Sequence, residues 1–491
     1  MTDLGCRITE IREGSSVLSG AAEKKQVRDF YNTIAPERQF WKEKNRYYHE
    51  AIESFIRANV SSKDAVLEIG CGLGDLLASL GSRHAVGIDF SEPMIRSARK
   101  KHTSCTFLVG DAENLPFKGS FDCVILSDTI GLLPDVQKAF DQLKSVTTSN
   151  SRIIITYYNY LWEPILKLGE FFGLKMPQPA QNWLPLEDIQ NILHLSGFEV
   201  IRKGHRLLCP KRIPFVSAFL NSVVAKLPLI RNLCLMEWII AKPLGQPQDP
   251  NLFSCSVVIP CRNERDNIVA AVTRTPRMGR STELVFVDGS STDGTLEEIE
   301  RMRREYPNRN IRLIHQGEPK GKCDAVQKGF EATTGDVLLI LDADLTVAPE
   351  DLPKFFNALV EGKGEFINGS RLVYPREKQA MRFLNLLGNK FFGLAFTYLL
   401  EQRFSDTLCG TKALWRQSYE KIKHGRVYFG DFDPFGDFDL IFGASKQNLK
   451  IVELPVRYRE RLYGTTKIRR FAHGWLLFKM CWIAMKKLKF V

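Results

Sequence analysis

The stretch LLILDADLTVAPEDL, residues 338–352, is an apolar run that ends on two aspartates, Asp342 and Asp344. Side chains two positions apart on a strand point to the same side, so both carboxylates are expected together. Two like charges repel unless a cation lies beside them, and hard divalent cations prefer oxygen ligands. Taken alone, the pair also fits two solvated aspartates before a helix near Pro349. A place at the carboxyl edge of a sheet, where α/β proteins bind ligands, favours the metal site.

Two strand-to-helix patterns precede this run. In CSVVIPCRNERDNI a strand ends at Pro260 and Glu264 lies in the turn before a helix. In ELVFVDGSSTDGT the next strand ends near Asp288, and a glycine-containing turn with Lys322 then leads through a helix into the aspartate pair. Short apolar runs that alternate with helical patterns predict a parallel α/β sheet.

Residues 254–470 resemble the family 2 glycosyltransferases with a GT-A fold, and within them polyprenyl-phosphate sugar transferases such as dolichyl-phosphate mannose and glucose synthases. The resemblance rests on six motifs in the family's order: VVIPCRNE, VDGSSTDGT, LDADLTVAPEDL, INGSRL, DTLCGTKALW and ELPVRYRERLYGTTK. It implies a GDP- or UDP-hexose donor and a Mg²⁺ or Mn²⁺ ion.

The resemblance implies a donor site built from named residues. The nucleotide-sugar contacts are Pro260, Glu264, Asp288, Lys322, Asp342 and Lys467. The metal ligands are Asp342, Asp344 and Thr346. Thr346 stands where some members of the family have glutamine, and Gly289 replaces the second aspartate of the commoner DDGS sequence. Metal binding is expected to survive these changes, whereas the identity of the nucleotide stays open.

The implied reaction is an inverting hexose transfer, in which an acceptor oxygen attacks the anomeric carbon as the metal-bound diphosphate leaves. The implied catalytic residues are Asp344, Arg371, Arg461 and Asp439. Arg371 and Arg461 suit phosphate binding because a guanidinium offers a fork of donors. A lipid-phosphate acceptor is already anionic, whereas a hydroxyl acceptor needs a base, for which Asp439 is the candidate.

Most of the net charge of +12 lies at the end of the chain, where residues 457–491 carry ten Lys or Arg against one Glu, a net +9. In this tail, four apolar residues recur at helical spacing: Trp475, Phe478, Trp482 and Met485. Residues 471–491 therefore predict a basic amphipathic helix, which fits an anionic membrane surface or a helix packed on its own domain. No basic patch elsewhere and no recognition motif indicates nucleic acid.

Two kinds of acceptor stay open. The apolar stretch FLNLLGNKFFGLAFTYLL (383–400), flanked by basic residues, suits a polyprenyl-phosphate or glycolipid acceptor at a membrane, although a buried helix pair explains it equally well. The alternative is a soluble enzyme that glycosylates a hydroxyl acceptor. Residues 213–230 come closest to a membrane span, but Asn221 and Lys226 interrupt them, so no span is expected.

A second glycine-rich turn lies in the N-terminal half. In AVLEIGCGLGDLLASL, residues 65–80, a buried strand meets three glycines and a helix follows. Glycines let a backbone approach a ligand closely, and a helix N-terminus offers free N–H groups. The spacing G-x-G-x-G, with Leu77 where a third dinucleotide glycine would stand, argues against NAD. The next strand ends on Asp89, where a carboxylate can accept both ribose hydroxyls.

Residues 40–160 resemble the class I S-adenosylmethionine-dependent methyltransferases. The resemblance rests on LEIGCGLG, GIDFSEPMI, GDAENLPF and FDCVILSDTIGLLPDV. It implies a Rossmann-like sheet whose cofactor site contains Glu68, Gly70, Gly72, Gly74, Asp89, Asp111 and Ala112. Candidate bases toward the methyl acceptor are Asp128, His194 and His205. The acceptor is expected to be a small molecule, a sugar or a lipid, and a catalytically silent cofactor-binding domain stays open.

The whole chain of 491 residues is expected to form two α/β domains. The predicted boundaries are a methyltransferase domain with a helical N-terminal extension (1–242), a proline-rich linker (243–252), a GT-A domain (253–470) and the basic tail (471–491). The 11 cysteines are scattered and odd in number, which indicates a reducing compartment. The expected location is therefore cytoplasmic, with peripheral contact to the membrane face. As a hypothesis, both domains serve one glycolipid or glycan pathway.

Overall fold

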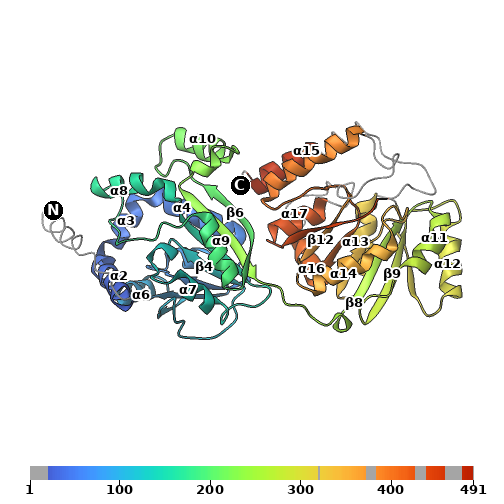
Figure 1. The fold of residues 1–491 in the computed structure, drawn as a ribbon, viewed down its shortest axis with the longest axis horizontal. Helices are drawn as coiled ribbons and strands as arrows, with labels where there is room; N and C mark the ends of the chain where they lie inside the picture. Colours follow the sequence, from blue (N-terminus) through green and yellow to red (C-terminus); the bar gives the residue numbers. More distant parts are fainter. Residues whose placement is uncertain (1–19, 319–320, 372–382, 426–437, 459–477, 490–491) are drawn as a thin grey trace. The chain divides into compact units, whose positions relative to one another are not determined.

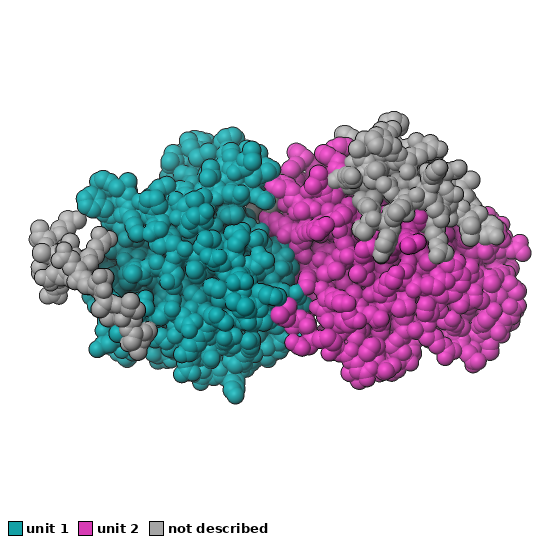
Figure 2. Space-filling view, viewed as in Figure 1, with its two compact units in different colours: residues 1–243 teal, residues 244–491 magenta. Residues whose placement is uncertain are grey.

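The chain folds into two compact units, residues 1–243 and 244–491, in a computed structural model (Figures 1 and 2). The structure describes residues 20–318, 321–371, 383–425, 438–458 and 478–489. Each unit is built on a seven-stranded mixed sheet. This confirms the predicted fold class of two α/β domains. Of the predicted C-terminal helix only residues 478–489 are described, and they are helical.

The sheet of the first unit has the strand order β3-β2-β1-β4-β5-β7-β6. Its strands are β1 (Ala65–Ile69), β2 (His84–Asp89), β3 (Thr106–Val109), β4 (Cys123–Ser127), β5 (Arg152–Tyr158), β6 (Phe198–Arg206) and β7 (Met236–Pro243). The first five are parallel, and β7 runs antiparallel to both β5 and β6. The chain reverses its direction of strand addition between β1 and β4, which is where an open α/β sheet binds its ligand.

Helices cover both faces of this sheet. Residues 20–243, the described part of this unit, contain the α-helices α2 (Gly20–Ile34), α3 (Arg38–Lys44), α4 (Arg46–Asn59), α5 (Asp75–Ser79), α6 (Glu92–Lys101), α7 (Val136–Leu143), α8 (Glu163–Phe171), α9 (Leu186–Leu195) and α10 (Val216–Ser222). On β1, Leu67 packs with α7 and α9, whereas Val66 packs with α4 and α6. The alternation of a strand therefore joins the two halves of the core.

The sheet of the second unit has the order β10-β9-β8-β11-β13-β12-β14. Its strands are β8 (Ser254–Cys261), β9 (Ser281–Asp288), β10 (Asn310–His315), β11 (Val337–Ile340), β12 (Phe366–Ser370), β13 (Lys412–Trp415) and β14 (Ile451–Pro455). Strand β13 runs antiparallel to β11 and β12, and the other neighbouring strands pair in parallel. The carboxyl ends of β8, β9 and β11 therefore meet at one edge.

Helices pack on both faces of this sheet as well. They are α11 (Arg265–Arg274), α12 (Thr295–Glu305), α13 (Lys322–Ala332), α14 (Leu352–Val360), α15 (Phe383–Leu400), α16 (Arg416–Gly425) and α17 (Phe438–Lys446). The first two pack with α14, and the remaining four share the opposite core cluster. Within the described residues, none of the helices is long and apolar enough to cross a membrane.

The proline-rich segment expected as a linker packs on the second unit. The backbone N–H of Gln248 donates to the carbonyl of Val360 at the end of α14. A Cβ on Gly245 would lie 2.2 Å from the carbonyl oxygen of Gly362, so only glycine allows the two backbones to approach this closely.

Candidate functional sites

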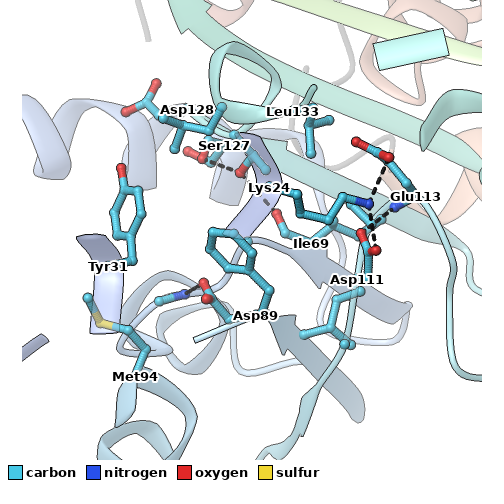
Figure 3. A pocket seen from close by; sticks show the side chains of 18 of the residues that line it. Lys24, Tyr31, Ile69, Asp89, Met94, Asp111, Glu113, Ser127, Asp128 and Leu133 are labelled. Atoms are coloured by element: carbon cyan, nitrogen blue, oxygen red, sulfur yellow. Dashed lines mark hydrogen bonds and ion pairs between the residues drawn. The ribbon is translucent and has the colours of Figure 1, made fainter. Parts of the chain in front are cut away.

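A pocket opens at the carboxyl ends of β1, β2 and β4 in the first unit (Figure 3). Five of the predicted cofactor residues line it: Gly70, Gly72, Asp89, Asp111 and Ala112. They come from three different strand ends, as the four motifs predicted. Gly72 has φ +52°, and a Cβ placed on it would meet no atom within 4 Å, so its backbone borders open space.

The other two predicted cofactor residues, Glu68 and Gly74, are not among the lining residues. Glu68 is buried on β1, and burial raises its pKa to about 8. Gly74 begins α5 with φ +75°, and a Cβ there would lie 2.4 Å from the ring of Phe107. These two residues flank the glycine turn in the chain and do not line the pocket.

Asp89 is oriented by two backbone N–H groups. Its carboxylate oxygens accept from Gly72 and Ser91, each at 2.9 Å. Burial raises the pKa of Asp89, against the opposing effect of these two hydrogen bonds. The glycine turn and the end of β2 are thus tied together, and the carboxylate is held at the pocket wall.

The helix α2 contributes a residue that the sequence reading missed. Lys24 forms ion pairs with Asp111 at 2.7 Å and with Glu113 at 2.8 Å. Glu113 is buried and also accepts from the backbone N–H of Asp135 at 3.0 Å. Figure 3 shows Lys24 reaching between the two carboxylates at one end of the pocket.

Asp128 lies at the other end of the pocket, next to Tyr31 in Figure 3. It follows β4 with φ +52°, an uncommon conformation for a residue with a side chain. Burial raises its pKa to about 6, although Tyr48 donates a hydrogen bond to it. Tyr48 stacks on Tyr158 with 5.5 Å between ring centroids.

The two other candidate bases lie outside this pocket. His194 is exposed on α9, and His205 on β6 lies 3.3 Å from the buried Glu237. Asp128 is therefore the one of the three that the structure places beside the predicted cofactor residues. Arg38 also lines the pocket, and its Nη1 donates to the sulfur of Met176 at 3.5 Å.

In the second unit, β8 and β9 bring three predicted donor-site residues to one edge. Pro260 pairs with Val287, the neighbour of Asp288, and Glu264 stands directly before α11. Asp288 is buried, and its Oδ2 accepts from the backbone N–H of Ser291 at 3.1 Å. Among the described residues its Oδ1 has no hydrogen-bond partner.

Gly289, which replaces the second aspartate of the commoner DDGS sequence, lies beside a glutamine. A Cβ on Gly289 would lie 3.0 Å from Oε1 of Gln316, which follows β10. The Nε2 of Gln316 donates to Asp324 and to the carbonyl of Gly321, each at 2.8 Å. A glutamine anchored to α13 and its turn thus lies beside the position where the commoner motif has an aspartate.

Asp342 lies among three cationic side chains. Lys322 forms an ion pair with it at 2.5 Å, and Arg371 and the buried Lys412 lie close enough to act on it electrostatically. Burial alone would raise the pKa of Asp342, but these three cations outweigh burial and hold the pKa below its usual value. A Cβ on Gly410 would lie 2.1 Å from Asp342 Oδ2, so the motif DTLCGTK needs glycine there.

Asp344 is held by Thr346. The backbone N–H and the hydroxyl of Thr346 donate to the same carboxylate oxygen, Oδ1, at 3.1 and 2.9 Å. The structure therefore gives Thr346, which was predicted as a metal ligand, a contact that orients the carboxylate. The carboxylates of Asp342 and Asp344 are the oxygen donors that Mg²⁺ and Mn²⁺ prefer.

Arg371 is fixed by a buried carboxylate. Its Nε and Nη2 donate to the two oxygens of Asp406, each at 2.8 Å, and its backbone N–H donates at 2.9 Å. The guanidinium also lies over the ring of Tyr458, 5.1 Å from its centroid. The pKa of Asp406 is held below its usual value, because Arg371 outweighs the effect of burial.

Three further residues were predicted for this site. Asp439 lies in the first turn of α17 and is partly buried. Arg461 and Lys467, in the motif RLYGTTK, lie outside the described residues. Their predicted roles stay predictions.

Comparison with known proteins assigns both units. The model of glycosyl transferase family 2 matches residues 256–423, and a methyltransferase domain model matches residues 60–193. A dolichol-phosphate mannosyltransferase of Mycosarcoma maydis is 33% identical over 227 residues, which cover 44% of this chain and 74% of that protein. The chain belongs to glycosyltransferase family 2. It also carries a methyltransferase domain, so the predicted fusion is confirmed.

Two further matches complete this comparison. The dolichol-phosphate mannosyltransferase of Pyrococcus furiosus is 30% identical over 218 residues, covering 44% of this chain and 59% of that protein, so the family 2 chain spans less than two thirds of this relative. A solved structure titled SAM-dependent methyltransferase, from Thermotoga maritima, matches 44% of this chain and 99% of its own, with 16% identity and a TM-score of 0.35.

Proposed function

We propose that the second unit transfers a hexose, with inversion, from a GDP- or UDP-hexose to a polyprenyl phosphate or another lipid-linked acceptor. The observation that carries the proposal is Asp342, set among Lys322, Lys412 and Arg371 at the carboxyl edge of β11. Acidic and basic side chains in one small site suit a substrate that brings both phosphate groups and a divalent cation.

The donor nucleotide would meet Asp288. An acceptor atom that is buried without a partner costs about 1–3 kcal/mol, and within the described parts of the chain the Oδ1 of Asp288 is such an atom. A ribose hydroxyl or a base N–H would satisfy it. Because Gln316 lies beside Gly289, an amide takes the place of a second carboxylate in recognising the nucleotide.

The departing diphosphate would meet positive charge. Asp342 and Asp344 would hold a Mg²⁺ or Mn²⁺ ion, which neutralises charge on the leaving diphosphate. Asp406 engages Nε and one Nη of Arg371, which leaves the other N–H groups of the guanidinium for a phosphate. Lys322 reaches the same corner from the start of α13.

A lipid-linked acceptor is favoured over a soluble hydroxyl by the apolar surface of α15 and the C-terminal helix. Phe391, Leu394, Phe478 and Trp482 are exposed there, and the rings of Phe391 and Phe478 lie 5.8 Å apart. Lys486 lies over the ring of Trp482, which gives the patch a basic border. Such a surface suits peripheral contact with the cytoplasmic face of a membrane.

The test is a panel of nucleotide-sugars with Mg²⁺ or Mn²⁺, offered to a polyprenyl phosphate and to soluble hydroxyl acceptors, with products read by mass. Asp344→Ala serves as the inactive control. A glycolipid product from the native chain alone supports the proposal. Transfer only to soluble acceptors contradicts the lipid assignment and returns Asp439 to the role of base.

For the first unit we propose methyl transfer from S-adenosylmethionine to a small-molecule, sugar or lipid acceptor. The cofactor supplies a methyl group already activated on a sulfonium, so the chain needs mainly to align the acceptor. Asp89 would hold the ribose, and Asp111 with Ala112 the adenine edge. Asp128, at the opposite end of the pocket from Lys24, would take a proton from the acceptor (Figure 3).

Calorimetry with S-adenosylmethionine tests this part. The native chain is expected to release heat on binding, and Asp89→Ala is expected to lose it. Asp128→Asn should bind the cofactor normally, because its change lies on the acceptor side. No heat with the native chain would favour a silent domain. As a hypothesis, both units act in one glycolipid or glycan pathway; it fails if the separated halves act on unrelated acceptors.

A further inference from the structure

Two neighbouring segments of the first unit expose many large apolar side chains. They are residues 160–174, which contain α8, and residues 213–233, which contain α10 and the short helices Val224–Lys226 and Arg231–Leu233. Of the 24 large apolar side chains exposed in the described chain, fifteen lie in these segments. Phe215, Leu229 and Phe171 are 92%, 89% and 83% exposed. Apolar exposure concentrated in this way marks an interaction surface.

The two segments form one surface. At one end the Nε1 of Trp162 donates to the carbonyl of Leu233 at 2.8 Å. At the other end the Nζ of Lys211 donates to the carbonyl of Leu174 at 3.4 Å. Figure 1 shows α8 and α10 along the same edge of this unit, next to α4. We call residues 160–174 and 211–233 together the apolar lobe.

The charges of the lobe favour an anionic partner. Residues 211–233 contain Lys211, Arg212, Lys226 and Arg231 and no Asp or Glu. The two acids of α8 are each paired, Glu163 with Lys167 and Glu170 with Lys175. A border of basic residues with no acid in residues 211–233, around exposed aromatic and aliphatic side chains, suits a lipid headgroup layer with acyl chains beneath it.

The backbone of the lobe is held in a shape that directs these side chains outward. Phe215 has φ +61° directly before α10, a conformation that costs free energy in a bulky residue. The side chain gains no core contact in return. Asn221 anchors the helix through hydrogen bonds to Tyr47 and to the backbone of Cys209. Specific hydrogen bonds therefore hold the backbone of the lobe in place, while its apolar side chains stay exposed.

We propose that the apolar lobe docks the methyltransferase unit on an anionic lipid bilayer. This inference goes beyond the proposed function, since docking requires neither reaction. At seven residues α10 is far too short to span a bilayer, so Phe215 and Leu229 enter only the headgroup and upper acyl region. Arg212 and its basic neighbours contact lipid phosphates. A lobe of this kind would bring the methyl-transfer pocket to lipid-borne acceptors.

The test is flotation of the full chain with vesicles of phosphatidylcholine, alone or mixed with phosphatidylglycerol. The double variant Phe215→Asp/Leu229→Asp is expected to lose about tenfold or more in partition coefficient, since two inserted apolar side chains are removed. Both residues are exposed, so the fold should survive. Leu195→Asp, an exposed leucine on α9 of the same unit, should partition as the native chain does. Arg212→Glu should weaken binding only to the anionic vesicles.

The lobe variants are compared with the native chain in two backgrounds: the unchanged chain, and a chain that also carries Phe478→Asp/Trp482→Asp. The second background removes the exposed aromatic residues of the C-terminal helix, so that a second membrane contact cannot hide the effect. A lower partition coefficient of the variant Phe215→Asp/Leu229→Asp in both backgrounds supports the proposal. Equal partitioning of the lobe variants and the native chain in both backgrounds overturns it. So does a native chain that binds no vesicles but forms a dimer that Phe215→Asp/Leu229→Asp dissociates, which would make the lobe an interface between copies.

Discussion

The hydroxyl of Tyr48 lies 2.9 Å from each carboxylate oxygen of Asp128 and donates to them. The two residues join α4 to the end of β4, beside the pocket that Asp89 and Asp128 line. A hydrogen bond to the charged carboxylate favours ionisation, but burial acts more strongly and raises the pKa of Asp128 to about 6. Asp128 thus changes charge near pH 6, which suits the role of base proposed for it.

The raised pKa predicts a pH-dependent effect of Asp128→Asn on stability. The folded chain binds more protons than the unfolded chain between about pH 4 and 6, so the buried carboxylate lowers the free energy of unfolding as pH rises through this window. Asparagine removes this penalty and still accepts from Tyr48. As the pH is raised from about 4 to 8, the free energy of unfolding of the variant should therefore rise relative to that of the native chain by up to about 3 kcal/mol, measured by urea unfolding. Asp141→Asn, which changes a partly exposed side chain on α7, should show no such gain. A pH-independent difference for Asp128→Asn would contradict the raised pKa.

Lys24 is predicted to hold α2 closed over the cofactor. Its ion pairs with Asp111 and Glu113 tie the helix to the pocket wall. Partly exposed ion pairs contribute about 0.2–1 kcal/mol each, so Lys24→Ala should speed dissociation of S-adenosylmethionine by roughly two- to tenfold in stopped-flow measurements. Lys25→Ala, which removes the exposed neighbour on the same helix, is the control. Equal dissociation rates would show that α2 does not gate release.

The strand ends could be predicted from the sequence, but the partners that fix them could not. Gly70, Gly72 and Asp89 follow buried apolar runs, and the local pattern of strand, glycine and helix places them at the pocket. Lys24 lies 87 residues from Asp111, and no local pattern links a lysine on an amphipathic helix to a distant turn. Such pairs follow from packing, which periodicity does not encode.

Glycines show the same limit in a second way. The family resemblance implied Gly74 as a cofactor contact, and the structure shows that this glycine also packs against Phe107 on β3. Similarly, the sequence marked Gly289 as a departure, but only the fold shows that Gln316 lies beside it. The basic residues of the apolar lobe do not stand out in the sequence because the C-terminal tail carries most of the net charge, although residues 211–233 contain no acid.

The buried pair Arg371–Asp406 is predicted to matter for both stability and transfer. Side-chain exposure is 11% for Arg371 and zero for Asp406, so Asp406→Asn leaves a guanidinium charge buried without its partner. Breaking such a pair costs about 3–5 kcal/mol. The free energy of unfolding of the second unit, measured by urea unfolding, should fall by that amount, and the rate of sugar transfer should fall as well. Binding of S-adenosylmethionine by the first unit should not change.

The chain offers a matched control for that prediction. Arg274 and Glu350 form the same two-point contact, at 2.8 and 2.9 Å, but their side chains are 33% and 52% exposed. Glu350→Gln should therefore cost less than about 1 kcal/mol. Equal losses in Asp406→Asn and Glu350→Gln would mean that burial does not set the cost of the inner pair.

Substitutions of Thr346 and Asp344 are predicted to affect metal binding in different ways. Asp344→Ala removes a carboxylate that would hold the metal, so Mn²⁺ binding in the presence of a nucleoside diphosphate, followed by electron paramagnetic resonance, should be lost. Thr346→Val removes only the hydroxyl that orients Asp344 Oδ1, at 2.9 Å, and keeps the shape of the side chain. Loss of an outer contact of this kind lowers metal affinity by about 10–100-fold, so excess Mn²⁺ should restore binding and transfer to Thr346→Val but not to Asp344→Ala. If Thr346→Val could not be rescued, Thr346 would be a direct ligand, as the family resemblance implied. If it bound Mn²⁺ as the native chain does, its hydrogen bond to Asp344 would have no part in metal binding.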